Sequence, residues 1–350
     1  AGEQSENNKT NDIIPKDRKN NNSLHTLSMT ELYDTTYPPK AAIIDGLLYA
    51  GAYLFVGAPK IGKSFLVLQM AYQVSMGAPF LGFSSRQGTV LYLALEDTCE
   101  RLQKRLAQMT EQDSEHLILS VFSETLDEGL TERLSDFWSE HADTVLVIID
   151  TLQRVRGRTP DNGSYAADYD TLARLKEFSD TYGVTVLVVH HTRKEGAEDV
   201  FNTISGTNGL MGAADGALLL HKDKRTASDA VLEVVGRDQS QLRLHLRFAA
   251  AHLRWELLEA ETERYREPPC PLLEVLSQLV NKENPSWNGT ATELAQCLSK
   301  MDSSQSFTPN WIVRTLNAQQ DTLLRKYDIH YVAYRTKEGK SLSLRWDGVR

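Results

Sequence analysis

The sequence has few cysteines, no long hydrophobic run and no excess of positive charge. Its three cysteines, Cys99, Cys270 and Cys297, lie far apart and form no Cys-x-x-Cys pair, which argues against a zinc site and a disulfide framework. Apolar runs such as residues 145–149 are far shorter than the ~20 residues of a membrane span. The N-terminus is polar and has no apolar signal segment. These absences predict a cytoplasmic protein without a membrane partner.

The charge balance excludes a protein whose whole surface is basic. The 350 residues carry a formal net charge of −9, so any contact with DNA must come from local patches or loops. Hydrophobic residues make up 41% of the chain, which is enough to build a sizeable core. The length suits roughly two domains of ~150 residues each.

The chain is predicted to begin with a polar arm and an α/β domain. Residues 1–30 are rich in Asn, Lys, Ser and Glu with almost no apolar periodicity, so we expect a disordered segment. Residues 31–266 alternate continuous apolar runs with helical patterns, which predicts a mostly parallel central sheet covered on both faces. From residue 216 to 256, successive strand-like runs with short turns predict a mixed or antiparallel extension of that sheet.

Prolines mark the boundary to a smaller third part. Pro268, Pro269 and Pro271 form a stiff spacer that cannot be helical. In residues 267–350 we expect helices at 272–280, 292–298 and 309–319 and strands at 330–335 and 341–346. Helices followed by a β-hairpin predict a small α+β winged-helix-like domain.

A glycine-rich segment carries the clearest chemical signal. Residues 57–64 match the pattern G-x-x-x-x-G-K-[ST] at every fixed position, after a predicted strand and before an apolar helix. Loop amides and the helix N-terminus then face an anion, Lys63 reaches the β- and γ-phosphates, and Ser64 binds Mg²⁺. ATP and Mg²⁺ are therefore the predicted ligands. The predicted ATP-binding residues are Gly57, Ala58, Pro59, Lys60, Ile61, Gly62, Lys63, Ser64 and Phe65.

Two carboxylates follow buried strands and are candidates for the reaction itself. Asp150 ends the apolar run 145–149, at the ligand edge of a parallel sheet, where it can hold the Mg²⁺ shell. Glu96 follows the run 90–95 and can polarise the attacking water as a general base. The alternatives are that Asp150 is an ordinary helix cap, and that Asp97 caps the next helix while Glu96 is a surface carboxylate.

A pair of histidines ends another strand. His190 and His191 close the run 184–189, beside Arg193 and Lys194. We expect the His191 imidazole to hydrogen-bond the γ-phosphate and to respond to its loss. The alternative is that the histidine is a satisfied core residue.

The order of these motifs resembles the RecA-like hexameric helicases, particularly the RepA-type plasmid helicases and, more loosely, the DnaB-type ATPase domain. The resemblance covers about residues 40–250 and is carried by the phosphate loop and by residues 92–97, 148–152 and 189–194. It implies a RecA-like P-loop NTPase core. It also implies an ATP-dependent DNA helicase or translocase in the replication of a plasmid or other mobile element, with ATP hydrolysed at subunit interfaces. The implied partners are single-stranded DNA, further copies of the chain in a ring, expected to be a hexamer, and a replication initiator or primase.

The same resemblance implies roles for several basic residues. Residues 235–238 look like the strand end that sends an arginine into the neighbouring subunit's ATP; DnaB-type helicases carry Lys-x-Arg there, Val235 replaces the lysine, and only Arg237 is carried over. Polar loops at 154–164 and 193–208 suit the central channel, where basic residues track a DNA strand. The predicted DNA-binding residues are Arg154, Arg156, Arg158, Arg193 and Lys194. The alternatives are a surface salt bridge for Arg237 and solvated surface loops for the others.

Two other functions remain open for such a chain. ATP can control assembly in a RecA relative that acts as a switch or recombination mediator without unwinding DNA. The winged-helix-like part can instead recognise a DNA site, with the ATPase as a switch. The sequence shows no DnaB-type N-terminal helical collar, which leaves room for both.

Overall fold

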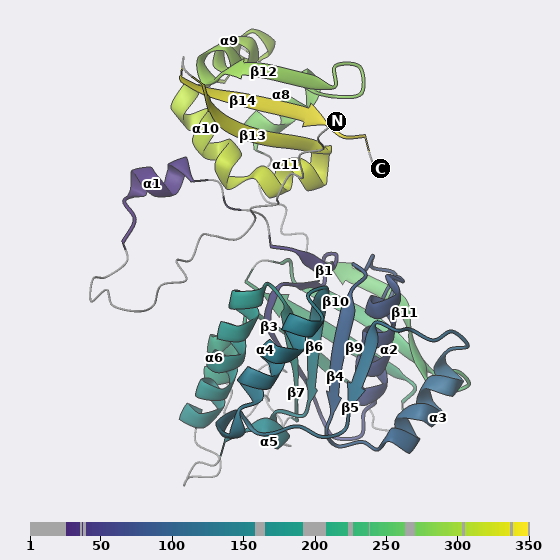
Figure 1. Ribbon diagram of the computed structural model, residues 1–350. Helices are drawn as coiled ribbons and strands as arrows, with labels where there is room; N and C mark the ends of the chain where they lie inside the picture. The colour runs from purple at the N-terminus through teal and green to yellow at the C-terminus, as the bar shows by residue number, and fades with distance from the viewer. Residues whose placement is uncertain are drawn as a thin grey trace, which may run out of the picture. The chain divides into compact units, whose positions relative to one another are not determined.

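The computed structural model describes residues 26–35, 37, 40–157, 165–191, 208–222, 227–237, 239–262, 270–302, 305–336 and 339–348. The chain divides into two compact units (Figure 1). One is Lys40–Arg266, and the other combines Ala1–Pro39 with Glu267–Arg350. The lower boundary of the larger unit is therefore Lys40 and not the expected residue 31.

A nine-stranded sheet organises the larger unit, in the order β11-β10-β9-β8-β3-β7-β6-β4-β5. The strands from β8 to β5 run parallel to one another, and β9, β10 and β11 extend them antiparallel. The prediction of a mostly parallel sheet is confirmed. The strands are β3 (Gly51–Gly57), β4 (Thr89–Ala94), β5 (Leu117–Ser120), β6 (Thr144–Asp150), β7 (Thr185–His191), β8 (Gly216–His221), β9 (Asp229–Gly236), β10 (Leu242–Ala249) and β11 (Arg254–Thr262).

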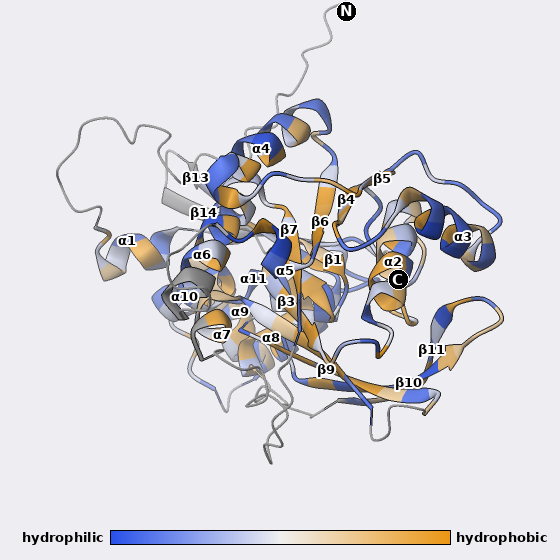
Figure 2. Cartoon of the chain, turned by 90° about the horizontal axis from the view of Figure 1, so that it is seen from below, coloured by the Kyte–Doolittle hydropathy of each residue, from blue (hydrophilic) through white to orange (hydrophobic). Residues whose placement is uncertain are grey.

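Helices cover both faces of this sheet, which is why its central strands are apolar along their whole length (Figure 2). One core cluster holds the apolar side chains of α2 (Lys63–Met76) and α3 (Cys99–Met109), and the other holds those of α4 (Leu130–Glu140) and α6 (Tyr165–Tyr182). Among the described residues, no helix has both the length and the apolarity needed to cross a membrane. The remaining elements are β1 (Ala42–Ile44), β2 (Leu48–Tyr49), η1 (Leu126–Glu128), α5 (Leu152–Val155) and α7 (Asn208–Ala213).

The smaller unit has its own core, built from helices packed on a three-stranded antiparallel sheet of order β12-β14-β13. The expected helices and hairpin lie here, joined by two elements that the sequence did not predict, β12 and α11. The winged-helix-like assignment stays a prediction that this element order suits. The elements are α8 (Pro271–Leu279), β12 (Ser286–Thr290), α9 (Ala291–Met301), α10 (Pro309–Ala318), α11 (Gln320–Tyr327), β13 (Ile329–Thr336) and β14 (Gly339–Trp346).

A short N-terminal helix, α1 (Met29–Asp34), packs on α10 of this unit. The Asn317 amide donates a hydrogen bond to the Tyr33 carbonyl at 2.7 Å, and the Arg314 guanidinium lies 4.7 Å from the centre of the Tyr33 ring. The segment therefore belongs with the C-terminal residues. Most of the predicted arm at 1–30 lies outside the described residues.

A buried ion pair connects a helix to the large sheet at the edge formed by the amino ends of its parallel strands. Asp215, just before β8, is 4% exposed and accepts hydrogen bonds from the Lys176 ammonium at 2.6 and 2.8 Å and from the Ala52 amide at 3.0 Å. Burial raises the pKa of Asp215, but the hydrogen bonds and charge of Lys176 outweigh it, so the pKa is lowered. The pair joins α6 to β3 and β8.

We expect Lys176→Met to lower the free energy of unfolding by about 3 kcal/mol, because it strips a buried carboxylate of its closest cation. Urea unfolding followed by circular dichroism measures the loss. The control is Lys104→Met, whose partner Glu100 is 73% exposed like Lys104 itself, and which should cost at most about 0.5 kcal/mol. Equal losses in the two variants would contradict the importance of the buried pair.

Candidate functional site

The carboxyl ends of four parallel strands bring the predicted site residues to one edge of the sheet. In the strand register Gly57 of β3 lies opposite His191 of β7, and Ala94 of β4 lies opposite Asp150 of β6. Glu96 follows β4 by two residues. Residues from positions 57 to 191 of the chain therefore meet where parallel sheets bind ligands.

The phosphate loop depends on two glycines that tolerate no side chain. A Cβ at Gly57 would lie 2.5 Å from the Leu220 carbonyl oxygen. Gly62 has a φ of +102°, in the left-handed region that favours glycine, and it is the N-cap residue of α2. Because α2 begins at Lys63, the free amides of its first turn face an anion placed at the loop.

Lys63 is a buried cation at the centre of the site. Its side chain is 5% exposed, and its ammonium donates hydrogen bonds to the carbonyl oxygens of Gly57 at 2.6 Å and Ala58 at 2.9 Å. Its Nζ also lies 2.9 Å from Nδ1 of His191. Burial lowers the pKa of Lys63 to about 8, while the charge of Asp150 opposes that shift.

Asp150 accepts two hydroxyl hydrogen bonds on one oxygen. Its Oδ2 accepts from Ser64 Oγ at 3.0 Å and from the Tyr92 hydroxyl at 3.1 Å. Burial raises the pKa of Asp150, and the hydrogen bonds from Ser64 and Tyr92 work against that rise. The predicted Mg²⁺ ligands Ser64 and Asp150 are thus in direct contact and offer the hard oxygen donors that Mg²⁺ prefers.

Two neighbours of this site were missed by sequence reasoning. Tyr92 is a hydroxyl-bearing residue within the apolar run of β4, which was the available signal, and Thr151 follows Asp150 directly. The Thr151 hydroxyl donates to Glu96 Oε1 at 3.1 Å and so holds that carboxylate near the loop. The described residues contain no group of three or more His, Cys, Asp or Glu side chains arranged for a metal ion. A cation here would need ligands from the nucleotide as well.

Glu96 faces the histidine, whereas Asp97 points elsewhere. Glu96 Oε2 lies 3.7 Å from Nε2 of His191, and the Glu96 side chain is 49% exposed, so water can reach it. Asp97 pairs with Arg101 and Arg105. The alternative that Asp97 caps the following helix is wrong, because the N-cap residue of α3 is Thr98.

Arg237 lies at the opposite edge of the sheet from the phosphate loop of its own chain. β9 runs antiparallel to β8, so its last residue, Gly236, lies opposite Gly216, the first residue of β8. The exposed Arg237 donates a hydrogen bond to the Gly212 carbonyl at 2.7 Å. Within one chain it is not part of the site.

The predicted DNA-binding residues fall only partly in the described chain. Arg154 lies in the short helix α5 and not in the expected loop, and its guanidinium donates to the Leu95 carbonyl at 3.2 Å, next to Glu96. Arg156 is the C-cap residue of that helix and is partly buried. Arg158, Arg193 and Lys194 lie outside the described residues.

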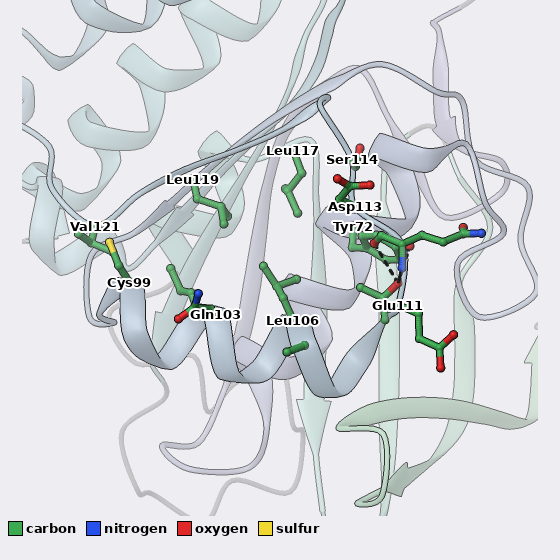
Figure 3. Close-up of a pocket in the computed structure, with 14 residues that line it drawn as sticks. Tyr72, Cys99, Gln103, Leu106, Glu111, Asp113, Ser114, Leu117, Leu119 and Val121 are labelled. Atoms are coloured by element: carbon green, nitrogen blue, oxygen red, sulfur yellow. Dashed lines mark hydrogen bonds between the residues drawn. The ribbon is translucent and has the colours of Figure 1, made fainter.

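A separate groove lies between α3 and the edge strand β5 (Figure 3). Its volume is about 490 Å³, and apolar side chains of both elements, including Leu106, Leu117 and Leu119, line it. None of the predicted site residues contributes to it. The groove is therefore distinct from the phosphate edge, by which we mean the carboxyl edge of the sheet that carries the phosphate loop.

Comparisons with known proteins agree with this geometry. A family described as AAA domain matches residues 21–197, slightly more than half of the chain. The DNA repair protein RadA of Streptococcus pyogenes serotype M6 is 25% identical over 159 residues, which are 44% of this chain and 31% of RadA. RadA of Halalkalibacterium halodurans is 28% identical over 167 residues, 47% of this chain and 33% of that protein. The chain thus spans about a third of these relatives.

Solved structures show the same fold at low sequence identity. A DnaB-like replicative helicase, solved in a study of its interactions with primase, has a TM-score of 0.50 and 14% identity, covering 60% of this chain and 59% of that one. An isolated ATPase domain matches with the same score and identity, covering 60% of this chain and 85% of its own. Both likenesses concern the fold alone.

The pKa of Lys63 generates a testable pH dependence. Phosphates favour the charged ammonium, so above pH about 8 the neutral amine must take up a proton to bind them. We expect the Kd for ATP to rise above that pH by up to about tenfold per pH unit. Titrations of a fluorescent ATP analogue between pH 6.5 and 9.5 measure this, with Lys63→Met as the control whose weaker binding should lack the step.

The lowered pKa of Lys63 weakens ATP binding as the pH rises, but it has the opposite effect on the stability of the fold. An unfolded lysine keeps its proton up to its ordinary pKa of 10.5, whereas folded Lys63 releases it near 8. Between those two values the unfolded chain binds more protons, so this residue makes stability rise with pH. A wild-type Kd for ATP that stays constant to pH 9.5 would contradict the lowered pKa.

Proposed function

This chain belongs to the AAA domain family and is a RecA-like P-loop ATPase, and from that premise we propose that it is an ATP-dependent DNA helicase or translocase of the RepA type. It would act in the replication of a plasmid or other mobile element. The observation that supports this most is the meeting of Lys63, Asp150, Glu96 and His191 at one sheet edge.

The residues of this edge divide the work of hydrolysis. The loop amides and Lys63 hold the phosphates of ATP, and Ser64 and Asp150 would hold Mg²⁺, which neutralises phosphate charge when bound. Glu96 takes a proton from the attacking water, for which its half-exposed carboxylate is suited. The Thr151 hydroxyl fixes one of its oxygens, so the other can face the water.

We infer that His191 reports on the γ-phosphate. Its Nδ1 lies 2.9 Å from the Lys63 ammonium and its Nε2 lies 3.7 Å from Glu96, so it contacts both the phosphate cation and the base. Gain or loss of a phosphate beside Lys63 would change the hydrogen bonds of this imidazole. Since His191 ends β7, it can pass that change to the residues that follow in the chain, which we propose contact single-stranded DNA.

The position of Arg237 is an argument for a ring of subunits. A side chain at the far edge of the sheet cannot serve its own phosphate loop, but it can enter the site of a neighbouring copy. We propose that ATP is hydrolysed at such interfaces in a homo-oligomer, expected to be a hexamer. Arg154 and Arg156, with the predicted DNA-binding residues Arg158, Arg193 and Lys194, would contact DNA.

The RadA relatives favour one alternative. They are DNA repair proteins, so a role as a recombination mediator or an assembly switch would also use this ATPase. In that case ATP turnover would control assembly on DNA without strand separation. A DNA-binding regulator that uses its C-terminal unit is a further variant of the same idea.

A strand-displacement assay on forked DNA separates these functions. If the chain is a helicase, the wild type displaces the labelled strand in the presence of ATP and Mg²⁺. The Lys63→Ala variant then neither displaces the strand nor hydrolyses ATP. Size measurement by sedimentation, with and without ATP and single-stranded DNA, follows ring formation in the same samples. Turnover and assembly without displacement would overturn the helicase proposal in favour of the switch.

We expect Glu96→Gln to bind ATP within about twofold of wild type and to lose turnover by ~10²-fold or more, the loss expected of a general base. Single-turnover hydrolysis and nucleotide titration measure the two effects. Glu100→Gln, at an exposed carboxylate four residues further on, is the matched control and should change neither. Unchanged hydrolysis in Glu96→Gln would place the base elsewhere.

We expect Arg237→Ala to bind nucleotide, to lose turnover, and to regain part of it when mixed with Lys63→Ala protein. In a mixed ring, an intact Lys63 site on one subunit meets an intact Arg237 from the next. Steady-state ATPase rates across mixing ratios measure the rescue.

The matched control for this mixture is Lys63→Ala with Glu96→Gln. Neither of those proteins has an intact Lys63–Glu96 site, so no arrangement of the ring restores activity. If Arg237→Ala and Lys63→Ala assemble together and stay inactive, Arg237 has no trans-acting role.

A further inference from the structure

The antiparallel extension of the sheet reaches back to the phosphate loop through one tryptophan. Trp255, near the start of β11, is 2% exposed, and its indole Nε1 donates a hydrogen bond to the Gly62 carbonyl at 3.2 Å. The indole also fills the space beside that glycine, because a Cβ at Gly62 would lie 2.7 Å from Trp255 Cζ2. No sequence motif had singled out this residue.

A second set of contacts fixes the backbone of Trp255 to the helix after the loop. Gln69 of α2 accepts a hydrogen bond from the Trp255 amide at 2.8 Å and donates one to the Trp255 carbonyl at 3.0 Å. Gln69 is 4% exposed, so both bonds are shielded from water. β11 and α2 are therefore held in one register, which sets where the indole meets Gly62.

Aromatic packing limits the indole to that place. Phe248 lies 5.2 Å from Trp255 between ring centres, and Phe65 lies 5.3 Å from Phe248. On another side, the Lys222 ammonium lies 5.1 Å from the centre of the Trp255 ring. The rings of Trp255, Phe248 and Phe65 thus connect the antiparallel part of the sheet to Phe65, the residue that follows the phosphate loop.

The Gly62 carbonyl matters because a peptide group is planar and trans. Its C=O direction fixes the N–H direction of Lys63, which points the opposite way. The carbonyl accepts from the Leu66 amide at 3.2 Å as well as from the indole, so it is held from within the helix. The Lys63 amide then faces the end of α2 where an anion binds.

We propose that Trp255 is a positioning residue for the phosphate loop. Its indole N–H and its bulk keep the Gly62 peptide in the orientation that aims the Lys63 amide at the nucleotide's phosphates. This inference rests on the proposed ATPase site and extends it to a strand of the antiparallel extension. The loop is thereby set by β11 as well as by the parallel strands that carry its other residues.

The test compares Trp255→Phe with Trp138→Phe in the full chain. Phenylalanine keeps an aromatic ring against Phe248 but removes the indole donor. Trp138 is a partly buried tryptophan of the same unit that packs on Tyr182 at 4.8 Å, on the other face of the sheet. Each substitution removes one indole, so the thermal midpoints report any general packing loss.

For Trp255→Phe we expect the KM for ATP and the Kd for ATP to rise about 3-fold to 10-fold, the effect of one buried hydrogen bond, with kcat within about twofold. Hydrogen exchange of the amides at 62–64 should quicken. Trp138→Phe should leave the nucleotide parameters and that exchange unchanged. We also expect ATP to change the tryptophan fluorescence of the wild type, and this change should persist in Trp138→Phe and shrink in Trp255→Phe.

Gln69→Met provides a second variant, since it removes the backbone contacts and leaves the indole in place. We expect it to raise the KM for ATP in the same direction. Wild-type protein that binds no ATP would overturn the proposed function itself. Normal ATP binding by the wild type together with unchanged KM and unchanged loop exchange in Trp255→Phe and Gln69→Met would overturn only the role of Trp255.

Discussion

The buried ammonium of Lys63 is the charge around which the phosphate edge is arranged. A cation taken out of water is costly unless oxygen atoms and opposite charges surround it. The carbonyls of its own loop supply part of that environment, and the carboxylates of Asp150 and Glu96 supply the rest. Asp150 ends β6 and Glu96 follows β4, so both strands must run parallel to β3 with their carboxyl ends at the same edge of the sheet. The helical crossovers of the sheet follow from that requirement.

The chemistry of this edge could be predicted from the sequence because each part is local. The phosphate loop is a continuous motif, and Asp150, Glu96 and His191 each follow a recognisable buried strand. Pairing between the parts was not predictable in the same way. The hydrogen bonds of Tyr92 to Asp150 and of Thr151 to Glu96 depend on β4 and β6 being neighbours in the sheet. The periodicity of apolar residues predicts that strands exist, but it does not predict their order in the sheet.

The other features of the structure that the sequence did not predict also depend on contacts between residues far apart in the chain. Trp255 and Gln69 are 186 residues apart in the chain, and nothing near either residue indicates the other. β12 contains Asn and Gly, which are poor strand formers, and it exists because β14 offers a partner edge. α1 is only six residues long and relies on Asn317 and Arg314 for its place, so its own sequence resembles a polar arm.

The contact between α1 and α10 changes how the two units are connected. Both ends of the chain contribute to the smaller unit, so the ATPase unit is inserted into it as a covalent loop. Removal of the C-terminal residues would leave α1 without the helix on which it packs. Residues from both sides of the ATPase unit therefore have to be present before the smaller unit can fold completely.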